Sequence, residues 1–403
     1  MPRILRILLA TWPALLLAYG YAGLKLYHAC VANLPFQASS VRLGLGAIVV
    51  FCNLYPLLLV LRHFITKDQR RQNPGDVNRF LDLLLAYPFW TGVILLVELL
   101  PWLLILDFIK LPLYPLFDRL RGEWLLIQHR VVLAILALYM LFILTRVFID
   151  TVRIKVVRIV LLAQNISASL HGLRIVHISD IHLDKRTKAR RLKRYVRKVN
   201  KLSPDVVFFT GDLSARDGES TLIAAGLLGQ VRSKYGVFAC LGDDETRPGM
   251  QMACDTLTEN QVTVLNNKNH LVRARGDSLL LTVITNTYAQ RPNLDNLSFL
   301  MGQQPRGTLD IIITHQPNES IVELASERGY HLFLAGHTHG GQVIVRPFGA
   351  RLTPARMETP FFKGVYNVGR MLVNVSSGLG FKDVPIRCRA PAEVSLIQVM
   401  RRR

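Results

Sequence analysis

Four stretches of the sequence are apolar over a length that can cross a lipid bilayer. A helix needs about 20 apolar residues to span the hydrocarbon core, and few polar residues mark a water-facing side on any of these runs. The sequence therefore predicts membrane spans within residues 7–24, 43–61, 80–109 and 131–148. Pro88 and Pro101 interrupt the third run, which leaves a fifth span open. Glu98 and Asp107 lie within or at the edge of that run, where a carboxylate needs either a partner or a function.

Charge is distributed unevenly along the chain. The sequence has 49 Lys and Arg against 28 Asp and Glu, a net charge of +21, although half of its residues are hydrophobic. Residues 1–150 contain 14 of the basic and 8 of the acidic residues, which leaves 35 basic and 20 acidic residues, a net +15, for the remainder. This segregation excludes a single soluble globule. It predicts a transmembrane region over 1–150 and a soluble basic domain over 151–403.

The loops between the spans predict which side of the membrane carries the soluble domain. Residues 28–40 contain no Lys or Arg, whereas residues 62–79 contain five. Basic loops tend to stay on the cytoplasmic side, so four spans, including an uncleaved first one, place the domain on the cytoplasmic side of the inner (cell) membrane. A fifth span would invert it. The five cysteines form no disulfide pattern, which agrees with a reducing compartment.

From residue 151 the pattern changes to short β-rich runs separated by helical and turn segments. Nine of these runs are predicted to be strands: 173–179, 205–210, 236–241, 279–284, 309–314, 331–335, 343–345, 371–375 and 394–399. Several of them end on a polar motif. Buried strands with chemistry at their carboxyl ends are typical of layered α/β folds.

Five polar motifs follow strands in a fixed order. They are Asp180-Ile181-His182, Gly211-Asp212, Gly242-Asp243-Asp244-Glu245, Thr314-His315 and Gly336-His337-Thr338-His339. Each motif alone is an ordinary turn or loop, but the ordered set predicts a metal site. Extended backbone would place both side chains of Asp-x-His, or of His-x-His, on one face. Imidazole with carboxylate suits Zn, Fe or Mn, and a bridging carboxylate allows two ions about 3.5–4 Å apart.

This order of motifs resembles the calcineurin-like metallophosphoesterase superfamily, whose pattern is Asp-x-His, Gly-Asp, Gly-Asn-His-Asp/Glu, His and Gly-His-x-His. The phrases LRIVHISDIHL, PDVVFFTGDL, FLAGHTHGGQV and VNVSSGLG look like its membrane-associated bacterial branch. The resemblance covers residues 150–400 and implies a four-layer (αββα) α/β domain following the multi-span α-helical membrane region.

The resemblance also implies roles for individual residues. One divalent metal ion (Mn, Fe or Zn) would be held by Asp180, His182 and His339, and a second by Asp243, His315 and His337. Asp212 would bridge the two ions, and a hydroxide between them would attack phosphorus. The implied activity is hydrolysis of a phosphodiester or pyrophosphate bond, with a lipid-linked substrate as one form of it. Asp212, His337 and Asp244 are the residues predicted to act in catalysis.

Asp244 is where this chain departs from the family, because the family has a histidine there that stabilises phosphate charge and protonates the leaving group. Three interpretations stay open. The substrate has a leaving group that needs little protonation, such as a pyrophosphate; a related group of diacylglucosamine-nucleotide pyrophosphatases also lacks that histidine. Alternatively, Asp244 or Glu245 is itself a protonated acid. In the third interpretation, the domain is a catalytically weak metal- and phosphate-binding module with a regulatory or protein-contact role.

Residues 185–201 contain ten basic residues on an amphipathic helical pattern. A solvated helix face is one interpretation, and contact with anionic lipid is the other. The residues predicted to contact a phospholipid membrane are Lys185, Arg186, Arg190, Arg191, Arg194, Arg197 and Lys198. No stacking motif accompanies the charge, so nucleic acid is not an expected partner.

Overall fold

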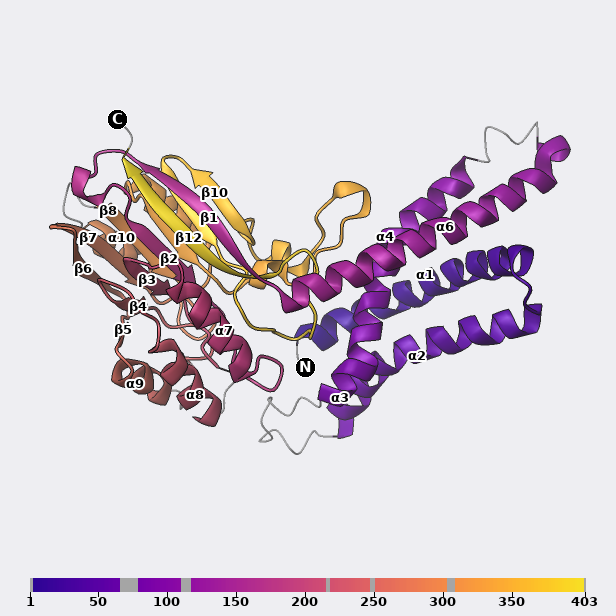
Figure 1. Cartoon of the computed structure of the whole chain (residues 1–403), viewed down its shortest axis with the longest axis horizontal. Coiled ribbons are helices and arrows are strands. Elements are labelled where there is room, and N and C mark those ends of the chain that lie inside the picture. Colours follow the sequence, from indigo (N-terminus) through magenta and orange to yellow (C-terminus); the bar gives the residue numbers. More distant parts are fainter. Residues whose placement is uncertain are drawn as a thin grey trace.

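The computed structural model describes residues 3–65, 79–109, 117–214, 218–246, 251–302 and 309–401. Residues 66–78, which carry most of the basic residues used to predict the inner loop, lie outside these ranges. The described chain forms a bundle of long helices and a two-sheet α/β domain, with α6 leading from the bundle into the first strand (Figure 1).

The bundle consists of four long apolar helices, as predicted. They are α1 (Arg3–Asn33), α2 (Ala38–Ile65), α4 (Tyr87–Phe108) and α6 (Phe117–Val152). The short helix α3 (Arg79–Leu81) and the π-helical turn η1 (Asp82–Ala86) lead into α4. By length and composition, four helices among the described residues can cross a membrane. Pro101 lies inside α4 without ending it.

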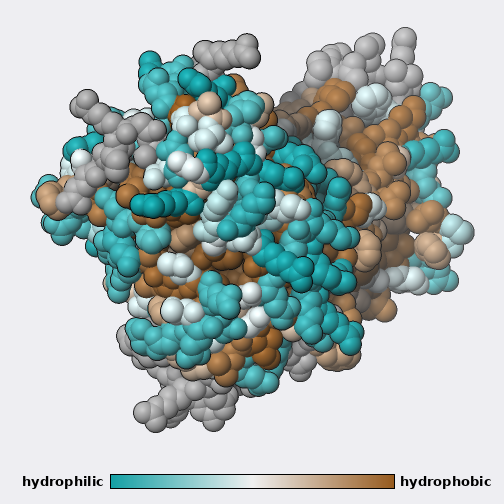
Figure 2. Space-filling model, turned by 60° about the vertical axis from the view of Figure 1, so that its left-hand side comes forward, coloured by the Kyte–Doolittle hydropathy of each residue, from teal (hydrophilic) through white to brown (hydrophobic). Residues whose placement is uncertain are grey.

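The bundle exposes the apolar side chains that a soluble protein would bury. Leu17 is 78% exposed, Leu43 76% and Leu138 67%. Figure 2 shows this difference between the two parts, with a largely hydrophobic surface on the helices behind and a largely hydrophilic one on the domain in front. An exposed apolar surface of this extent is stable in lipid and costly in water, which agrees with membrane association.

The α/β domain contains two six-stranded sheets. The first has the order β1-β12-β2-β3-β4-β5 and the second β10-β11-β9-β8-β7-β6. The first sheet comprises β1 (Ile154–Ala163), β12 (Ala392–Arg401), β2 (Arg174–Ile178), β3 (Val206–Phe209), β4 (Val237–Ala239) and β5 (Val262–Val264). The second comprises β10 (Gly364–Val368), β11 (Met371–Val375), β9 (Leu332–Ala335), β8 (Leu309–Thr314), β7 (Asp277–Ile284) and β6 (Lys268–Ala274).

Side-chain alternation along the strands produces the four layers. On β2, Ile175 faces the second sheet, where it joins Leu281 and Ile311 in one apolar core. Its neighbour Val176 faces the opposite way, into a core shared with the helices that cover the first sheet. Because successive side chains point to opposite faces, a strand buried on both faces reads as a continuous apolar run.

Helices cover the outer face of each sheet. The first sheet is covered by α7 (Ala189–Asn200), α8 (Gly218–Leu228) and α9 (Gln251–Glu259), and the second by α10 (Leu294–Gly302) and α11 (Glu319–Glu327) (Figure 1). Short 3-10 turns occupy Ala168–Leu170, His339–Gly341, Pro347–Gly349 and Pro354–Met357. The predicted four-layer αββα architecture is confirmed.

One predicted strand is wrong and four strands were not predicted. Residues 343–345 form only two isolated bridges, Val343 with Cys388 and Val345 with Leu352. The strands β1, β5, β6 and β10 had no prediction. Charged residues such as Lys155 and Arg158 interrupt the apolar pattern of β1, which is a strand because β12 pairs with it in parallel over its full length.

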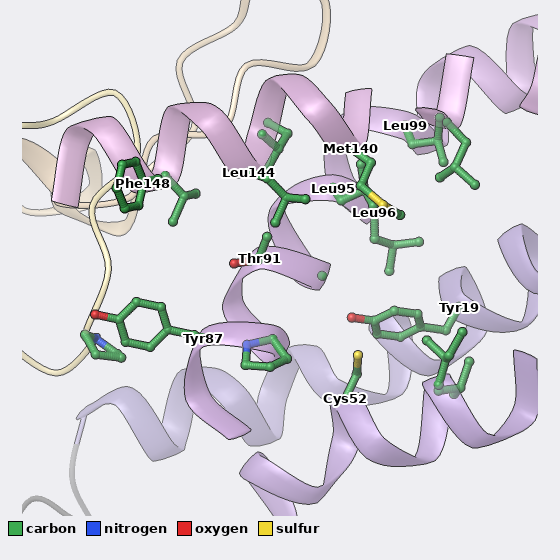
Figure 3. Close-up of a pocket in the computed structure, with 18 of the residues that line it drawn as sticks. Tyr19, Cys52, Tyr87, Thr91, Leu95, Leu96, Leu99, Met140, Leu144 and Phe148 are labelled. Carbon is green, nitrogen blue, oxygen red and sulfur yellow. The ribbon is translucent and has the colours of Figure 1, made fainter. Parts of the chain in front are cut away.

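Two buried ion pairs connect the bundle to the domain. Glu98 of α4, only 3% exposed, forms a bidentate pair with Arg389, and its Oε1 accepts the backbone N–H of Arg346 at 3.0 Å. Arg186 binds Asp82 of η1 through Nε–Oδ2 at 2.6 Å and Nη2–Oδ1 at 2.9 Å. The four long helices also surround a cavity that reaches the domain (Figure 3). The domain division after residue 150 falls in the last turn of α6 and stays a prediction.

Candidate metal centre

All seven side chains predicted to bind metal lie in loops at the carboxyl ends of five strands. Asp180 and His182 follow β2, Asp212 follows β3 and Asp243 follows β4 in the first sheet, while His315 follows β8 and His337 and His339 follow β9 in the second. These strands run parallel within each sheet. Their ends therefore meet at one edge of the domain, which brings residues separated by up to 159 positions together.

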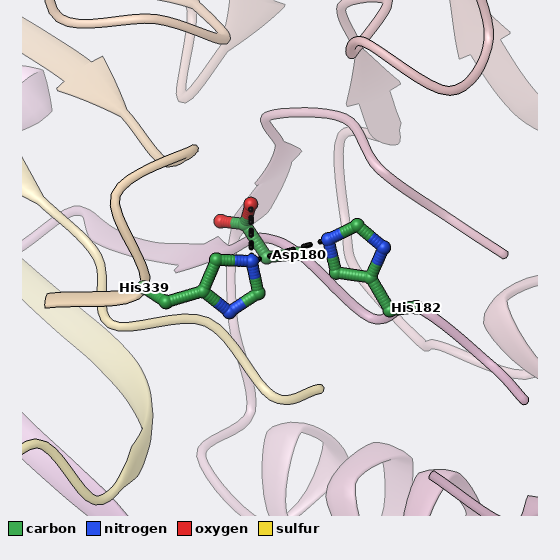
Figure 4. Close-up of side chains that lie close together, drawn as sticks. All are labelled: Asp180, His182 and His339. Atoms are coloured by element: carbon green, nitrogen blue, oxygen red, sulfur yellow. Dashed lines mark hydrogen bonds and ion pairs between the residues drawn. The ribbon is translucent and has the colours of Figure 1, made fainter. Parts of the chain in front are cut away.

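The first cluster contains Asp180, His182 and His339 (Figure 4). The two imidazole Nε2 atoms lie 3.1 Å apart, and His339 Nε2 lies 3.6 Å from Asp180 Oδ1. All three side chains are buried. Ligands at about 2.1 Å from one metal ion lie about 3 Å from one another, so these separations suit a single ion between the three groups.

The second cluster contains Asp243, His315 and His337. Asp243 Oδ2 lies 2.8 Å from His337 Nδ1 and 3.5 Å from His315 Nε2. The two imidazole nitrogens are 3.3 Å apart. This geometry also suits one ion.

Asp212 lies between the two clusters. Its Oδ2 is 3.2 Å from His182 Nε2 in the first cluster and 3.4 Å from His315 Nε2 in the second. Its other oxygen, Oδ1, accepts the backbone N–H of Asp244 at 2.9 Å. Oδ2 is buried and accepts no hydrogen bond within the described chain, and the same holds for Asp243 Oδ2. Buried carboxylate oxygens need a cation or a donor, so both atoms fit a two-metal centre with a bridging Asp212.

Hydrogen bonds on the outer side fix which imidazole nitrogen faces the centre. His315 Nδ1 lies 2.7 Å from the carbonyl oxygen of Thr210, to which it can only donate. His182 Nδ1 lies 3.1 Å from Asp244 Oδ2 and donates there in the same way. A neutral imidazole has one donor nitrogen and one lone pair, so both Nε2 atoms direct lone pairs at the carboxylates of the centre. Lone pairs facing carboxylates repel one another unless a cation lies between them.

The backbone around the clusters is strained. The φ angles are 48° at Asp180, 40° at His182, 59° at Asp212, 67° at His337 and 52° at His339. Left-handed conformations are costly for residues other than glycine and concentrate at functional sites. The expectation that Asp-x-His and His-x-His lie in extended backbone is therefore wrong. His337 and His339 lie in different clusters, which is the division that the resemblance implied.

Two glycines allow the loops to approach one another. A Cβ at position 242 would lie 2.3 Å from the backbone nitrogen of Asp212, and a Cβ at position 336 would lie 1.8 Å from Ser179 Oγ. Any larger residue would push apart the loops that carry the ligands.

The titration of the histidines reflects the excess of carboxylates. Burial opposes protonation of His182, but Asp212 and Asp244 outweigh it and raise its pKa to about 10. Burial likewise opposes protonation of His315, whose pKa Asp212 and Asp243 hold well above its usual value. In the absence of metal, two imidazoles must bind protons to balance the buried carboxylates. Divalent ions would supply that charge instead.

Glu245 holds two of the ligand loops together. Its Oε2 accepts the backbone N–H groups of Gly242 at 2.7 Å and Asp212 at 2.9 Å, and its Oε1 accepts that of Leu213 at 2.7 Å. Burial and the charge of Asp212 raise the pKa of Glu245 to about 7. Both oxygens are engaged by backbone donors, which favours a structural role for Glu245, and its role as the leaving-group acid stays a prediction.

Lys382 is a component of the site that sequence reasoning missed. Its Nζ lies 3.6 Å from Asp212 Oδ2 and 3.8 Å from Asp243 Oδ2. It lies in the loop after β11, next to the phrase VNVSSGLG, but no motif singles it out. Burial works against its charge, while the carboxylates of Asp212 and Asp243 raise its pKa.

Two of the seven predicted membrane-surface residues are placed differently. Arg186 is engaged by Asp82, and Arg191 is only 8% exposed, with Nη1 donating to the carbonyl oxygen of Thr151 at 2.7 Å. Both face the bundle because the loop and first turn of α7 pack against it. Lys198 is half-buried and donates to the carbonyl oxygen of Ile154. The exposed members are Lys185, Arg190, Arg194 and Arg197.

Residues 173–341 match the family model described as calcineurin-like phosphoesterase. A transmembrane protein with metallophosphoesterase domain from Danio rerio is 30% identical over 253 residues, which cover 60% of this chain and 56% of that protein. An uncharacterized metallophosphoesterase of Campylobacter jejuni is 30% identical over 232 residues, covering 56% of this chain and 59% of that protein. The chain thus spans little more than half the length of these relatives.

A shorter match is closer in sequence. A UDP-2,3-diacylglucosamine pyrophosphatase of Chlamydia muridarum is 47% identical over 79 residues, which cover 19% of this chain and 24% of that protein. Among solved structures, a 5'-nucleotidase precursor of Thermus thermophilus aligns with a TM-score of 0.36 at 15% identity, covering 56% of this chain and 55% of that one. The family match spans the strands that carry both metal-ligand clusters. Residues 173–341 therefore form a calcineurin-like phosphoesterase domain, as the motifs predicted.

Proposed function

We propose that this protein is a membrane-anchored, two-metal phosphohydrolase that cleaves a phosphodiester or pyrophosphate bond in a lipid-linked substrate. The observation that supports it most is the position of Asp212 Oδ2, at 3.2 Å from one cluster and 3.4 Å from the other, without a hydrogen-bond donor of its own among the described residues. In such a centre two divalent ions activate water and neutralise phosphate charge.

The residues of the chain divide into three roles in this proposal. Asp180, His182 and His339 hold one ion, Asp243, His315 and His337 the other, and Asp212 bridges them. Thr210, Asp244 and Glu245 position these ligands. The ammonium of Lys382 lies where it can approach the oxygens of a bound phosphate and stabilise their negative charge.

This arrangement favours a substrate with a good leaving group. Asp244 faces His182 Nδ1, and no histidine among the described residues stands in the place of the family's acid. General acid catalysis is worth about 10² to 10⁴ in rate. A pyrophosphate leaves without that help more readily than an alkoxide does. The partial match to a diacylglucosamine pyrophosphatase supports the same substrate class.

The alternative is a catalytically weak module that binds metal and phosphate. It is favoured by the same replacement of histidine by Asp244, which adds negative charge where phosphate would bind. The two functions differ in turnover and not in metal content.

The deciding experiment uses the full chain in detergent. We expect about two transition-metal ions per chain and hydrolysis of bis-p-nitrophenyl phosphate. The variant Asp212→Asn should lose both, while Asp295→Asn, at an exposed position in the first turn of α10, should lose neither. Metal with no turnover of this ester or of a diacyl pyrophosphate would favour the binding module, and absence of metal would refute the centre.

We further propose that the soluble domain lies on the cytoplasmic side of the inner membrane. Four apolar helices return the chain to its starting side, and the exposed basic residues Arg190, Arg194 and Arg197 of α7 would then face the anionic leaflet. A C-terminal fusion to a reporter that is active only in the cytoplasm should be active. Activity of an exported reporter alone would contradict this orientation.

A further inference from the structure

The four long helices surround a cavity of about 890 Å³ with almost wholly apolar walls. Ligand pockets in proteins measure about 300–1,000 Å³, so this one has room for a large molecule. Figure 3 shows side chains from all four helices facing the same space, among them Tyr19, Cys52, Leu95 and Met140. The walls belong to helices that can cross a membrane, so an occupant can enter from the bilayer.

One end of the cavity is formed by the soluble domain. Arg186, Phe381 and Pro385 line it there, beside Thr151 at the end of α6. Arg186 follows the metal-centre residue His182 by four positions, and Phe381 directly precedes Lys382. The two loops touch, because a Cβ at Gly380 would lie 2.8 Å from the Cβ of His182. The same pair of loops therefore borders both the cavity and the metal centre.

The charged groups at this end are Arg186, Asp82 and Arg191. Arg186 and Asp82 both line the cavity and neutralise each other. Arg191 lies against two lining residues, with its guanidinium 5.0 Å above the ring of Phe381 and Nη1 on the carbonyl oxygen of Thr151. Its Nε and Nη2 are buried and have no hydrogen-bond partner within the described chain. A buried guanidinium with unused donors is costly unless an anion binds it.

We propose that the cavity holds the acyl chains of a phosphate-bearing lipid and presents that lipid's phosphate to the metal centre. This inference rests on the proposed function and specifies its substrate. Acyl chains match the apolar walls at the depth of the bilayer, and an anionic head group matches the unpartnered donors of Arg191 and the divalent ions beyond it. A water-soluble nucleotide would leave the walls without a matching surface.

Two glycines of α1 provide a matched pair of variants. Gly23 lines the cavity, and no atom lies within 4 Å of a Cβ built on it. Gly20 lies one turn earlier, is exposed, does not line the cavity and has equally open space around its Cβ. Gly23→Phe should fill part of the cavity, whereas Gly20→Phe adds the same ring to the outer surface of the same helix.

The first readout compares two esters with the same leaving group, using full-length protein in detergent. One is the p-nitrophenyl ester of phosphatidic acid and the other is bis-p-nitrophenyl phosphate. In wild type and Gly20→Phe, kcat/KM should favour the diacyl ester. In Gly23→Phe the ratio of the two kcat/KM values should fall by at least about ten-fold. A ratio near one in wild type, or an unchanged ratio in Gly23→Phe, would overturn the proposal.

The second readout does not depend on turnover. Native mass spectrometry should detect phosphatidic acid retained by wild type and Gly20→Phe, and lost from Gly23→Phe. Equal retention of phosphatidylcholine would identify a bulk membrane lipid and overturn the proposal. If wild type hydrolyses neither ester but retention follows Gly23, the proposed hydrolase function fails while the lipid site stands.

Discussion

The helix bundle and the α/β domain neutralise their buried charges in different ways. In the bundle each described buried or half-buried carboxylate has a cationic partner: Asp107 pairs with Lys25, Asp82 with Arg186, Glu98 with Arg389 and Asp150 with Arg146. At the metal centre the basic groups beside the carboxylates are mainly histidines, together with Lys382. The carboxylates are those of Asp180, Asp212, Asp243 and Asp244. The chain balances its own charge in the bundle, but leaves the centre dependent on ions from solution.

The largest effect is expected where that dependence is removed. Asp243→Ala deletes a carboxylate whose Oδ1 is held by Tyr288 N and Gln316 Nε2, leaving Oδ2 for the metal. Activity should fall by more than the roughly 10- to 100-fold typical of changes outside the ligand shell, and the metal content should fall to one ion. Atomic absorption and ester hydrolysis measure both.

Asp243→Asn is the matched control for that variant, since it keeps an oxygen ligand and restores the family's residue. It should retain both ions. Loss of metal in Asp243→Asn equal to that in Asp243→Ala would show that the charge of Asp243, and not its ligand oxygen, decides metal binding.

The next largest effect is expected at the ion pairs that join the bundle to the domain. Glu98→Gln leaves Arg389 buried without its counter-charge and should destabilise the full chain by about 3–5 kcal/mol. Chemical denaturation in detergent measures it. For comparison, Lys234→Ala disrupts an ion pair with Asp205 in which the lysine side chain is 67% exposed, and should cost less than about 1 kcal/mol. Equal effects would remove the distinction between buried and exposed pairs.

Asp244→Asn sharpens the comparison inside the centre. The carboxylate orients His182 and increases its basicity, so metal affinity should fall by about 10- to 100-fold. A competitive chelator titration gives the affinity without reference to turnover. Unchanged affinity together with abolished hydrolysis would instead make Asp244 a catalytic residue.

The smallest effect concerns His177, which lies fully buried under the centre and bonds Thr210 and Asn374. Burial lowers its pKa to about 3, below the value near 6.5 that it has in the unfolded chain. Above pH 6.5 His177 is neutral in both the folded and the unfolded state, so its titration does not change the stability. As pH falls below 6.5, only the unfolded state gains a proton, so stability should fall by about 1.4 kcal/mol per pH unit.

His177→Gln should flatten this slope between pH 6.5 and 5.5, as measured by denaturation at each pH. An identical slope in both proteins would assign the pH dependence to other groups.

Sequence alone determined the features that depend on local pattern. The four apolar runs were long enough to specify membrane helices because lipid requires a continuous apolar surface. The motif order predicted which side chains gather in the two clusters, because each of them follows a buried strand. Most strands of both sheets were found for the same reason. Residues 154–163 were not found, since their pairing with β12 joins segments more than 200 residues apart.

Only the tertiary structure decided what depends on contacts between distant segments. It placed Lys382 beside Asp212, 170 residues away, and turned Asp244 toward His182. It also paired Arg186 with Asp82 instead of exposing it to lipid. Each of these charges could as well be solvated in an isolated segment. Their roles are set by the packing of loops and helices, because a charge excluded from water must find its partner wherever the fold brings one within reach.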